Sequence, residues 1–280
     1  MTEWLELCRA AVADVEDVLA RLPTRAEREP VVGAGAGGDE TTAIDQAAEE
    51  AILERIRGAA GAVVSEEIGR VGGGALPLVV VDPIDGSLNA KRGIPFFSLS
   101  IAVAEGETMD DVVFGFVHDF GSGEQWTARR GEGAWLGAEP VGVVLPKDEI
   151  EILSFEATRT SLVARDAPKV AELAHRLRIM GSLALSLCHL AAGRVDAVCS
   201  LKPARSVDIA AAQLLCREVG LPIDLFDVEQ PFGAAPLDLE QRSRVVAAGS
   251  AAVCDRLAAA LRDDAGSFLR CVPPAELPRA

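Results

Sequence analysis

The sequence predicts an α/β protein with an α+β N-terminal part and an α/β C-terminal part. Three patterns predict this class: apolar residues at helical spacing near the start, strands joined by tight turns in the middle, and alternating strands and helices afterwards. The pattern changes near residues 140–150, so we expect an N-terminal domain at 1–147 and a C-terminal domain at 148–280. A chain of 280 residues is near the upper limit for one hydrophobic core, which favours one or two closely packed domains.

The N-terminal part is expected to begin with a helix at residues 4–22. Charged side chains interrupt this stretch throughout, so we expect no signal peptide. The glycine-rich residues 31–38 predict a mobile loop, and a second helix is expected from about Thr42 to Gly58. The short apolar runs at 63–64 and 78–81 each end in acidic residues, which predicts buried strands that deliver carboxylates to one edge of a sheet.

The middle of the chain predicts an antiparallel meander, because strand-like runs at 97–103, 112–117 and 124–129 are separated by short glycine-containing turns. After residue 148 strands and helices alternate. The elements expected there are a strand at 150–155, a helix near 169–177, a strand near 178–180, a helix at 182–192, a strand at 195–200, and helices at 207–219 and 251–261.

Composition limits the functions to consider. Hydrophobic residues make up 49% and charged residues 25% of the chain, as in a folded protein. The net charge of −16 disfavours nucleic acids and anionic membranes as partners, and no apolar run is long enough to span a bilayer. The six cysteines are scattered without a CxxC pair, which favours reduced thiols and a cytoplasmic location. An anionic substrate would need local positive charge from a cation cluster, a metal ion or backbone N–H groups.

The most informative segment follows the apolar run at 78–81 and contains Asp82 and Asp85, three residues apart with a proline between them. Proline ends the strand, so both carboxylates can point into one small volume, where they repel each other unless a cation lies between them. Carboxylate oxygens suit Mg²⁺, and the following Gly86-Ser87 can offer N–H groups to a phosphate at the start of a helix. A turn capped by aspartates remains the alternative interpretation.

Other acidic residues are ambiguous when taken singly. Glu66 and Glu67 follow a short apolar strand, where an exposed pair of glutamates is usually a solvated turn. Asp39 and Asp45 lie near the start of the second helix, and Asp208 lies at the start of another, where helix capping is the ordinary explanation.

Together these segments resemble the inositol monophosphatase family of lithium-sensitive, Mg²⁺-dependent sugar-phosphate phosphatases. The order and spacing of the acidic segments carry the resemblance, together with Asn89 and supporting segments at 93–102, 128–134 and 181–197. Residues 93–97 and 201–211 resemble the archaeal-type fructose-1,6-bisphosphatase/inositol-1-monophosphatase branch. The resemblance implies a layered αβαβα sandwich.

The resemblance also implies a metal site with two or three Mg²⁺ ions per subunit. Its ligands would be Glu66, Asp82, the backbone carbonyl of Ile84, Asp85 and Asp208, with Glu67 as a weaker candidate.

The remaining catalytic roles come from the same resemblance. Asp45 and Ser87 would orient and deprotonate the attacking water, with Glu66 as a further catalytic residue, and the N–H groups of Gly86 and Ser87 would hold the phosphate. The reaction would be direct in-line attack by a metal-activated water, without a phosphoenzyme. A haloacid-dehalogenase-type mechanism is disfavoured because it needs two aspartates spaced by two, not three.

Substrate contacts are less clearly indicated. Inositol-specific members carry a glutamate where this chain has Leu201. Lys202 and Arg205 could hold a second phosphate, and Arg178 is a further candidate, but these cations could equally balance an acidic surface.

We therefore expect a phosphomonoester hydrolase that acts on a small sugar or polyol phosphate, either inositol monophosphate or fructose 1,6-bisphosphate or both. The alternatives are a 3′-phosphoadenosine 5′-phosphate or histidinol-phosphate phosphatase of the same family, and a catalytically silent sugar-phosphate-binding protein. The family resemblance implies a homodimer.

Overall fold

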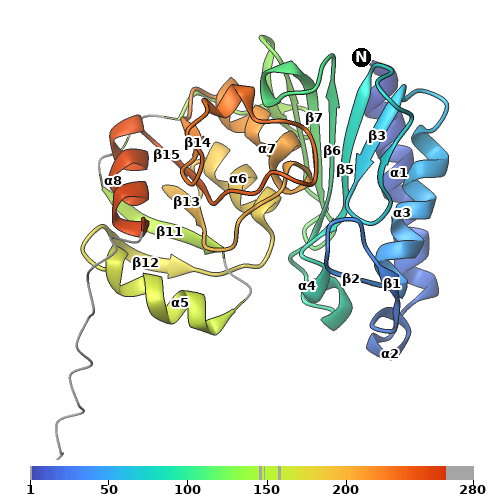
Figure 1. The fold of residues 1–280 in the computed structure, drawn as a ribbon, viewed down its shortest axis with the longest axis horizontal. Helices are drawn as coiled ribbons and strands as arrows, with labels where there is room; N and C mark the ends of the chain where they lie inside the picture. Colours follow the sequence, from blue (N-terminus) through green and yellow to red (C-terminus); the bar gives the residue numbers. More distant parts are fainter. Residues whose placement is uncertain (1, 145–146, 148, 157–158, 263–280) are drawn as a thin grey trace, which may run out of the picture.

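The computed structural model of the chain describes residues 2–144, 147, 149–156 and 159–262. Two sheets alternate with three layers of helices (Figure 1). From one side to the other, the layers are helices α1 and α3, an eight-stranded sheet, helices α6 and α7, a five-stranded sheet, and helices α5 and α8. This arrangement confirms the layered αβαβα sandwich.

The outer helical layer on the N-terminal side consists of α1 (Thr2–Arg21) and α3 (Ala43–Ile56). Their apolar faces pack against each other and against one face of the eight-stranded sheet, where Val15, Ile44 and Ile52 are fully or almost fully buried. The helical spacing of these residues is the pattern from which both helices were predicted. The short helix α2 (Arg25–Arg28) connects this layer to the hairpin of β1 (Val31–Ala34) and β2 (Glu40–Thr42).

The eight-stranded sheet has the order β10-β9-β8-β7-β6-β5-β3-β4. All neighbouring pairs are antiparallel except β3 and β5, which run parallel. Both of these strands therefore end at the same edge of the sheet. The acidic residues after the two apolar runs led to this expectation. The strands are β3 (Ala62–Ser65), β4 (Gly69–Val71), β5 (Leu78–Asp85), β6 (Ser98–Ala104), β7 (Val112–Asp119), β8 (Gln125–Arg129), β9 (Gly133–Leu136) and β10 (Glu139–Pro140), with α4 (Ser87–Arg92) between β5 and β6 and a 3₁₀ turn, η1 (Met109–Asp111), before β7.

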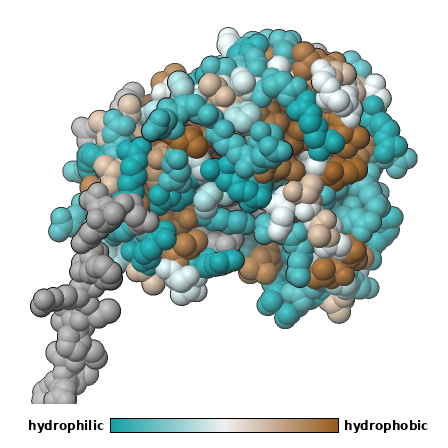
Figure 2. All heavy atoms as spheres, in the orientation of Figure 1, coloured by the Kyte–Doolittle hydropathy of each residue, from teal (hydrophilic) through white to brown (hydrophobic). Residues whose placement is uncertain are grey.

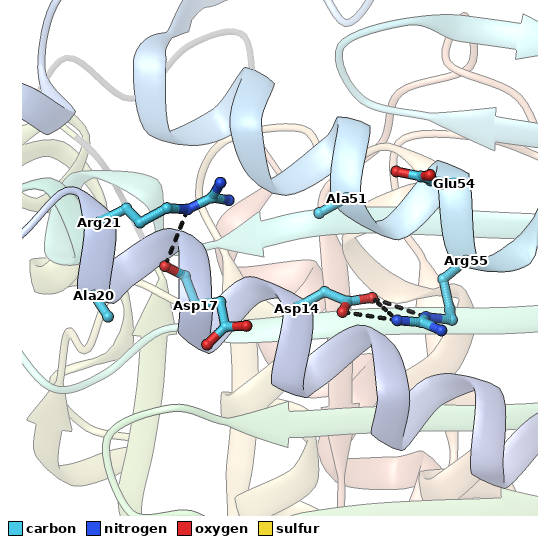
Figure 3. A pocket seen from close by; sticks show the side chains of 7 residues that line it. All are labelled: Asp14, Asp17, Ala20, Arg21, Ala51, Glu54 and Arg55. Carbon is cyan, nitrogen blue, oxygen red and sulfur yellow. Dashed lines mark hydrogen bonds and ion pairs between the residues drawn. The ribbon is translucent and has the colours of Figure 1, made fainter.

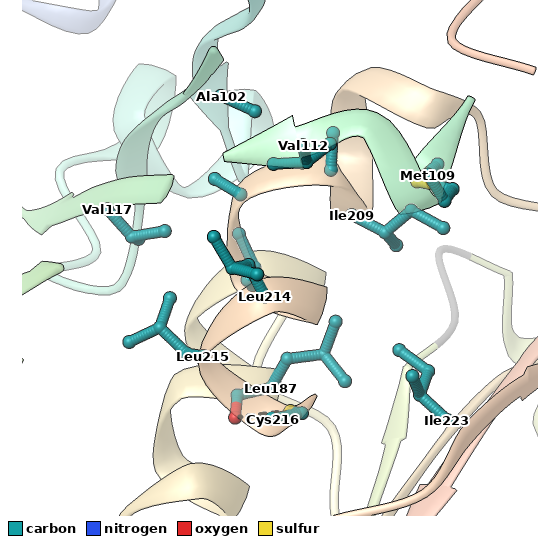
Figure 4. Packing of buried hydrophobic residues seen from close by; sticks show 14 of the residues in the cluster. Ala102, Met109, Val112, Val117, Leu187, Ile209, Leu214, Leu215, Cys216 and Ile223 are labelled. Atoms are coloured by element: carbon teal, nitrogen blue, oxygen red, sulfur yellow. Dashed lines mark hydrogen bonds between the residues drawn. The ribbon is translucent and has the colours of Figure 1, made fainter. Parts of the chain in front are cut away.

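The helices between the sheets are α6 (Leu183–Ala191) and α7 (Ser206–Glu218). Both are buried around almost their whole circumference, because each faces a sheet on two sides. Figure 4 shows Leu214 and Leu215 of α7 packed among residues of the neighbouring strands and of α6, where the thiol of Cys216 donates to the carbonyl of Leu187 at 3.5 Å. This shared core links the two sheets.

The five-stranded sheet has the order β12-β11-β13-β15-β14, with parallel pairs on the β12 side and antiparallel pairs on the β14 side. Helices α5 and α8 cover its outer face (Figure 1). The elements are β11 (Ile150–Glu156), α5 (Thr160–Asp166), the 3₁₀ turn η2 (Ala167–Val170), β12 (Ala174–Arg178), β13 (Ala197–Ser200), β14 (Ile223–Leu225), the 3₁₀ turn η3 (Phe232–Ala234), β15 (Val245–Ala248) and α8 (Ala251–Leu261).

Three sequence predictions of local structure were wrong. The strand expected near 178–180 lies earlier in the chain, because β12 ends at Arg178. The expected helix at 169–177 is a 3₁₀ turn followed by strand β12, because pairing with β11 from Ile150 to Ser154 gives these residues an extended edge-strand position. The expected loop at 31–38 is partly strand β1, which pairs with β2 through contacts such as Ala34 with Glu40. Strands β14 and β15 were not predicted.

The two sheets lie on either side of residues 147 and 148 in the chain, and the division into domains at that point remains a prediction. No helix in the described part of the chain is long and apolar enough to cross a membrane. Figure 2 shows hydrophilic residues over most of one face, interrupted by separate hydrophobic patches. The five cysteines in the described residues are buried and free, and Cys271 lies outside that part of the chain.

Candidate active site

A cavity of about 190 Å³ lies where the carboxyl ends of β3 and β5 approach the start of α7. Most of the residues that the sequence singled out line it. Those residues are Asp39, Glu66, Asp82, Ile84, Asp85, Gly86, Ser87, Lys202, Arg205 and Asp208, and they are joined by Glu156, Gly181, Leu183 and others.

The parallel pairing of β3 and β5 brings the first three carboxylates together. Ser65 is opposite Val81 in this pairing, so Glu66 follows β3 beside the point where Asp82 occurs in β5. The pairing of β5 with β6 shifts register between Asp82 and Asp85, where Pro83 cannot donate a ladder hydrogen bond. The expectation that this proline ends the strand was wrong, because β5 continues to Asp85. The carboxylate of Asp82 accepts a hydrogen bond from the backbone N–H of Ile84 at 3.1 Å, which fixes the local turn.

The fourth carboxylate comes from α7, in the layer between the sheets. Asp208 lies in the first turn of this helix, and its carboxylate accepts a hydrogen bond from the backbone N–H of Arg205 at 2.6 Å. The aspartate is therefore a helix cap, as its position suggested, and it also lines the cavity. Its position is compatible with both interpretations made from sequence, and its role as a metal ligand stays a prediction.

Arg205 lies among these carboxylates. Its Nη2 is 2.6 Å from Oε1 of Glu66 and 3.0 Å from Oδ1 of Asp208, and its Nη1 is 3.7 Å from Oδ2 of Asp39. The side chain is only 7% exposed, so its interactions with Glu66 and Asp208 are largely buried, whereas Asp39 is 58% exposed.

Burial and mutual repulsion change the acidity of the carboxyl groups. Burial raises the pKa of Glu66 to about 7; Arg205 opposes this effect, and the nearby Asp208 and Glu67 add to it. Burial likewise raises the pKa of Asp85 to about 7, and burial together with Glu66 and Asp85 raises the pKa of Asp82 well above its ordinary value. Such a set of groups ionises readily only when positive charge is close by.

The donor set fits a hard divalent cation, which prefers carboxylate oxygens. Nη1 of Arg205 is buried beside these groups without a hydrogen-bond partner, so the surrounding carboxylates do not satisfy every donor of this guanidinium. Among the described residues, no three acidic, histidine or cysteine side chains already form a compact metal-binding group. Oε1 of Glu66 and Oδ1 of Asp208 contact Arg205 instead.

Asp85 is held from the opposite side by the start of α6. Its Oδ2 accepts hydrogen bonds from the hydroxyl of Ser182 at 2.5 Å and from the backbone N–H of Ala184 at 2.7 Å. The segment before α6 is in turn held by Glu156, whose carboxylate accepts from the N–H groups of Met180 and Gly181 at 3.2 and 2.8 Å. The second sheet thus fixes a carboxylate of the first.

Gly86 allows a close approach between the two halves of the site. Its φ of 91° favours glycine, and a Cβ there would lie 3.0 Å from the carbonyl oxygen of Gly181. Asn89 of α4 donates from Nδ2 to the carbonyl groups of Phe96 and Met180, both at 2.8 Å. Ser87, the first residue of α4, lines the cavity between these contacts.

Three predicted site residues are not part of the cavity lining. Asp45 accepts hydrogen bonds from Thr42 and lies 3.6 Å from Nζ of Lys91, so its proposed pairing with Ser87 stays a prediction. Glu67 accepts a hydrogen bond from the hydroxyl of Thr41. Arg178 is exposed at the end of β12 and donates to the carbonyl of Leu177, so its role also stays a prediction.

Lys202 lies at the edge of the cavity nearest the β1–β2 hairpin. Its Nζ is 3.2 Å from Oδ2 of Asp39, and it is 42% exposed. Arg242 donates to the carbonyl of Gly37 in the same hairpin. Backbone N–H groups of Ala36 and Gly37 donate at 2.8 Å to the carbonyls of Glu67 and Glu66, respectively. These contacts hold the hairpin turn against the cavity, where the sequence predicted a mobile loop.

Several residues that hold the site were not predicted from sequence. Glu156 follows a predicted strand directly, which is the signal that identified Asp82, but only one carboxylate occurs there. Glu49, in the middle of α3, accepts from the N–H groups of Glu67 and Ile68 at 3.2 and 3.1 Å and so holds the turn after β3. Helical spacing distinguishes Glu49 from the exposed Glu50 and Glu54, because Glu49 shares a face with the apolar Ile52 and Ile56.

A second, more open groove lies between α1 and α3 (Figure 3). Its most prominent contact is the ion pair of Arg55 with Asp14, in which both hydrogen bonds measure 2.8 Å. Its side chains are otherwise surface residues of two packed helices, and none of the site residues predicted above lines it.

Comparison with known proteins agrees with this geometry. A sequence model of the inositol monophosphatase family matches residues 2–265. A fructose-1,6-bisphosphatase/inositol-1-monophosphatase of Thermococcus kodakarensis is 33% identical over 78% of this chain and 82% of its own length. The protein of the same name from Archaeoglobus fulgidus is 31% identical over 87% of this chain and 92% of its own length.

A solved structure supports the same conclusion about the fold. A Pyrococcus horikoshii protein, described as having similarities to inositol-1 monophosphatase, superposes with a TM-score of 0.78 at 25% identity. The match covers 92% of this chain and 98% of that protein. With the family match over most of the sequence and the archaeal relatives above 30% identity, the chain belongs to the inositol monophosphatase family.

Proposed function

We propose that the protein is a Mg²⁺-dependent phosphomonoester hydrolase that removes phosphate from a small sugar or polyol phosphate. One observation carries the proposal: Glu66, Asp82, Asp85 and Asp208 converge on one cavity, next to Gly86 and Ser87. Two archaeal relatives named as fructose-1,6-bisphosphatase/inositol-1-monophosphatase support the same substrate class.

The four carboxylates and the carbonyl of Ile84 would hold the metal ions, two or three per subunit. When bound, Mg²⁺ supplies positive charge to phosphate oxygens and lowers the pKa of a water molecule. This local charge explains how a chain with a net charge of −16 can bind an anionic substrate. Ser182 and Ala184 hold Asp85 in its orientation, because both donate to the same carboxylate oxygen.

The remaining roles follow the position of each side chain. Gly86 and Ser87 would donate N–H groups to the phosphate, and the Ser87 hydroxyl would orient the attacking water together with Asp45. Lys202 would contact a second phosphate or another anionic group, because it is the exposed cation at the mouth of the cavity. Arg205 would join it once released from the carboxylates, and Arg178 remains a more distant candidate.

We further propose a cytoplasmic homodimer that binds neither nucleic acid nor membranes. The acidic net charge supports the last two expectations, since a net negative charge repels polyanions.

The function is tested by measuring phosphate release with and without Mg²⁺ from inositol 1-phosphate, fructose 1,6-bisphosphate, 3′-phosphoadenosine 5′-phosphate and histidinol phosphate. We expect Mg²⁺-dependent release from one or both of the first two substrates. Preference for the nucleotide or for histidinol phosphate would keep the metal chemistry and reject the proposed substrate. Binding of these compounds without release from any of them would instead favour a silent binding protein.

A further inference from the structure

The guanidinium of Arg205 occupies the part of the site where the carboxylates of the two halves meet. Its Nη2 contacts Glu66, which follows the first sheet, and Asp208, which belongs to α7. Its Nε is also 3.4 Å from the second oxygen of Asp208. A planar guanidinium can satisfy two carboxylates at once in this way, whereas a surface arginine pairs with one and is largely hydrated.

The side chain of Arg205 is buried. It is 7% exposed, and Nη1 is buried without a hydrogen-bond partner, 3.7 Å from Asp39. A Cβ on Gly37 would lie 2.5 Å from Nη1, so the turn of the β1–β2 hairpin closes directly over the guanidinium. Arg205 is therefore enclosed by the cavity wall and the hairpin and does not extend into solvent.

Arg205 contacts oxygens of two of the four carboxylates that the proposed function assigns to the metal ions. Lone pairs of Oε1 of Glu66 and Oδ1 of Asp208 that accept from Nη2 are not available to a cation at the same time. Two positive groups at the same oxygens also repel each other strongly in a buried site. A divalent cation and the observed position of Arg205 therefore compete.

We propose that Arg205 is an internal counter-ion of the metal-free protein, which a divalent cation must displace from Glu66 and Asp208 in order to bind. Arg205 then stabilises the protein before metal binding and weakens its affinity for the metal. The displaced guanidinium remains at the cavity, where it becomes available to an anionic group of the substrate. The inference rests on the proposed function, because the cation is the one assigned there.

The test measures the affinity for Mn²⁺, used as a probe that electron paramagnetic resonance detects directly, together with thermal unfolding in EDTA. The proteins are the wild type, Arg205→Met, Arg205→Lys and Lys202→Met. Methionine keeps the length of the side chain and removes the charge. Lys202→Met is the matched control, because it removes one positive charge from the same cavity wall, where the contact is to Asp39 rather than to Glu66 or Asp208.

We expect Arg205→Met to bind the first Mn²⁺ about tenfold more tightly than the wild type, and to unfold at a lower temperature in EDTA, because its carboxylates repel each other without a counter-ion. Arg205→Lys should have a Mn²⁺ affinity and a melting temperature between those of the wild type and Arg205→Met, since an ammonium cannot span both carboxylates as a guanidinium does. Lys202→Met should change the Mn²⁺ affinity by less than about threefold, because a more exposed charge is screened by water.

Unchanged or weaker Mn²⁺ binding by folded Arg205→Met would overturn the proposal, because Arg205 would then support the metal site instead of competing for it. If Lys202→Met increased the Mn²⁺ affinity as much as Arg205→Met does, the proposal would also be overturned, because the effect would then come from the loss of any positive charge near the cavity. If Arg205→Met folds only in the presence of Mn²⁺, the counter-ion role is supported. If Arg205→Met does not fold at all, Arg205→Lys is used instead: tighter Mn²⁺ binding than the wild type supports the proposal, and unchanged or weaker binding overturns it. Phosphate release by the wild type is measured separately, so a protein that binds Mn²⁺ but releases no phosphate would reject the proposed function and leave this inference standing.

Discussion

At the scale of single residues, the candidate site depends on carboxylates that are buried close together. Asp82 is 2% exposed and Asp85 is 9% exposed, values that are unusual for aspartate unless a partner compensates for the lost hydration. Asp85 has such partners in Ser182 and Ala184, and Glu66 has one in Arg205. Each carboxylate is thus oriented by a contact that the chain itself supplies.

Replacing Asp85 with Asn should reduce Mg²⁺-dependent phosphate release at least about a hundredfold, because an amide is a poor ligand for a hard cation. The fold should persist, since asparagine keeps an oxygen that can accept from Ala184. Asp14→Asn, on the surface between α1 and α3, is the control and should retain wild-type activity. Substantial phosphate release by folded Asp85→Asn would reject the assignment of Asp85 as a metal ligand.

At the scale of secondary-structure elements, the start of α6 connects the two halves of the site. Glu156 at the end of β11 accepts hydrogen bonds from two backbone N–H groups and from the hydroxyls of Ser154 and Ser186, at 2.8 Å each for the hydroxyls. Ser182 caps α6 through the N–H of Leu185 and also donates to Asp85. Replacing Glu156 should therefore alter the position of Asp85, because Glu156 holds the segment before α6 and the start of α6 holds Asp85.

Glu156→Gln should lower the free energy of unfolding by about 2 kcal/mol, because the amide N–H₂ cannot accept from the donors that now face a carboxylate oxygen. Chemical denaturation provides the measurement. Glu151→Gln is the control on the same strand, where the side chain is 64% exposed and its pair with Arg176 should contribute little. Equal losses in both variants would show that Glu156 has no special structural role.

Asp166, at the end of α5, gives a prediction about pH. Burial opposes its ionisation, but hydrogen bonds from Arg165 and Lys169 outweigh this effect and lower the pKa of the carboxyl group below 3.8. A carboxyl group with a lowered pKa in the folded state stabilises the protein above the unfolded value and loses that contribution as pH falls through the folded value. The melting temperature should therefore fall as pH decreases from 5 toward 3, and this fall should be smaller in Asp166→Asn.

Asp255→Asn on the exposed side of α8 is the control for the acid effect, and its melting temperature should follow the wild-type dependence on pH. If Asp166→Asn also follows the wild type, the ion pairs of Asp166 do not contribute to acid stability.

At the scale of the whole molecule, the candidate metal site lies between the first sheet and the helical layer of α6 and α7, which are otherwise held together by the shared hydrophobic core. Glu66, Asp82 and Asp85 belong to the first sheet and its strand ends, whereas Asp208 belongs to α7 between the sheets. A ligand that contacts both sets connects the layers directly, in addition to the packing of α6 and α7 (Figure 4).

Removal of divalent cations with EDTA should therefore lower the melting temperature, and Mg²⁺ should restore it in proportion to its concentration. A ligand that binds only the folded state stabilises it by about 2.7 kcal/mol at a hundred times its dissociation constant. Differential scanning calorimetry across a Mg²⁺ titration measures this effect, with Asp85→Asn as the control that should respond much less. A melting temperature independent of Mg²⁺ in the wild type would contradict binding at this site.

Much of the fold could be predicted from sequence, because its local patterns agree with the final structure. Helix α8 occupies the predicted residues 251–261, and both apolar runs before Glu66 and Asp82 form buried strands, although β5 continues past its run to Asp85. The region at 169–177 was mispredicted because a helical pattern was overridden by pairing with β11, a partner that local spacing does not reveal. The short strands β14 and β15 depend on each other and on β13 in the same way.

The sequence by itself determined the family resemblance and the carboxylates that follow its apolar runs, because both depend on local residue types and their spacing. The layered fold was implied by that resemblance. Only the tertiary structure decided which side chains share the cavity: it placed Asp45 and Arg178 outside the lining and added Glu156 to it. It also placed Arg205 between Glu66 and Asp208. The physical reason is that contacts between residues more than a hundred positions apart depend on how the two sheets pack around α6 and α7, which no local pattern specifies.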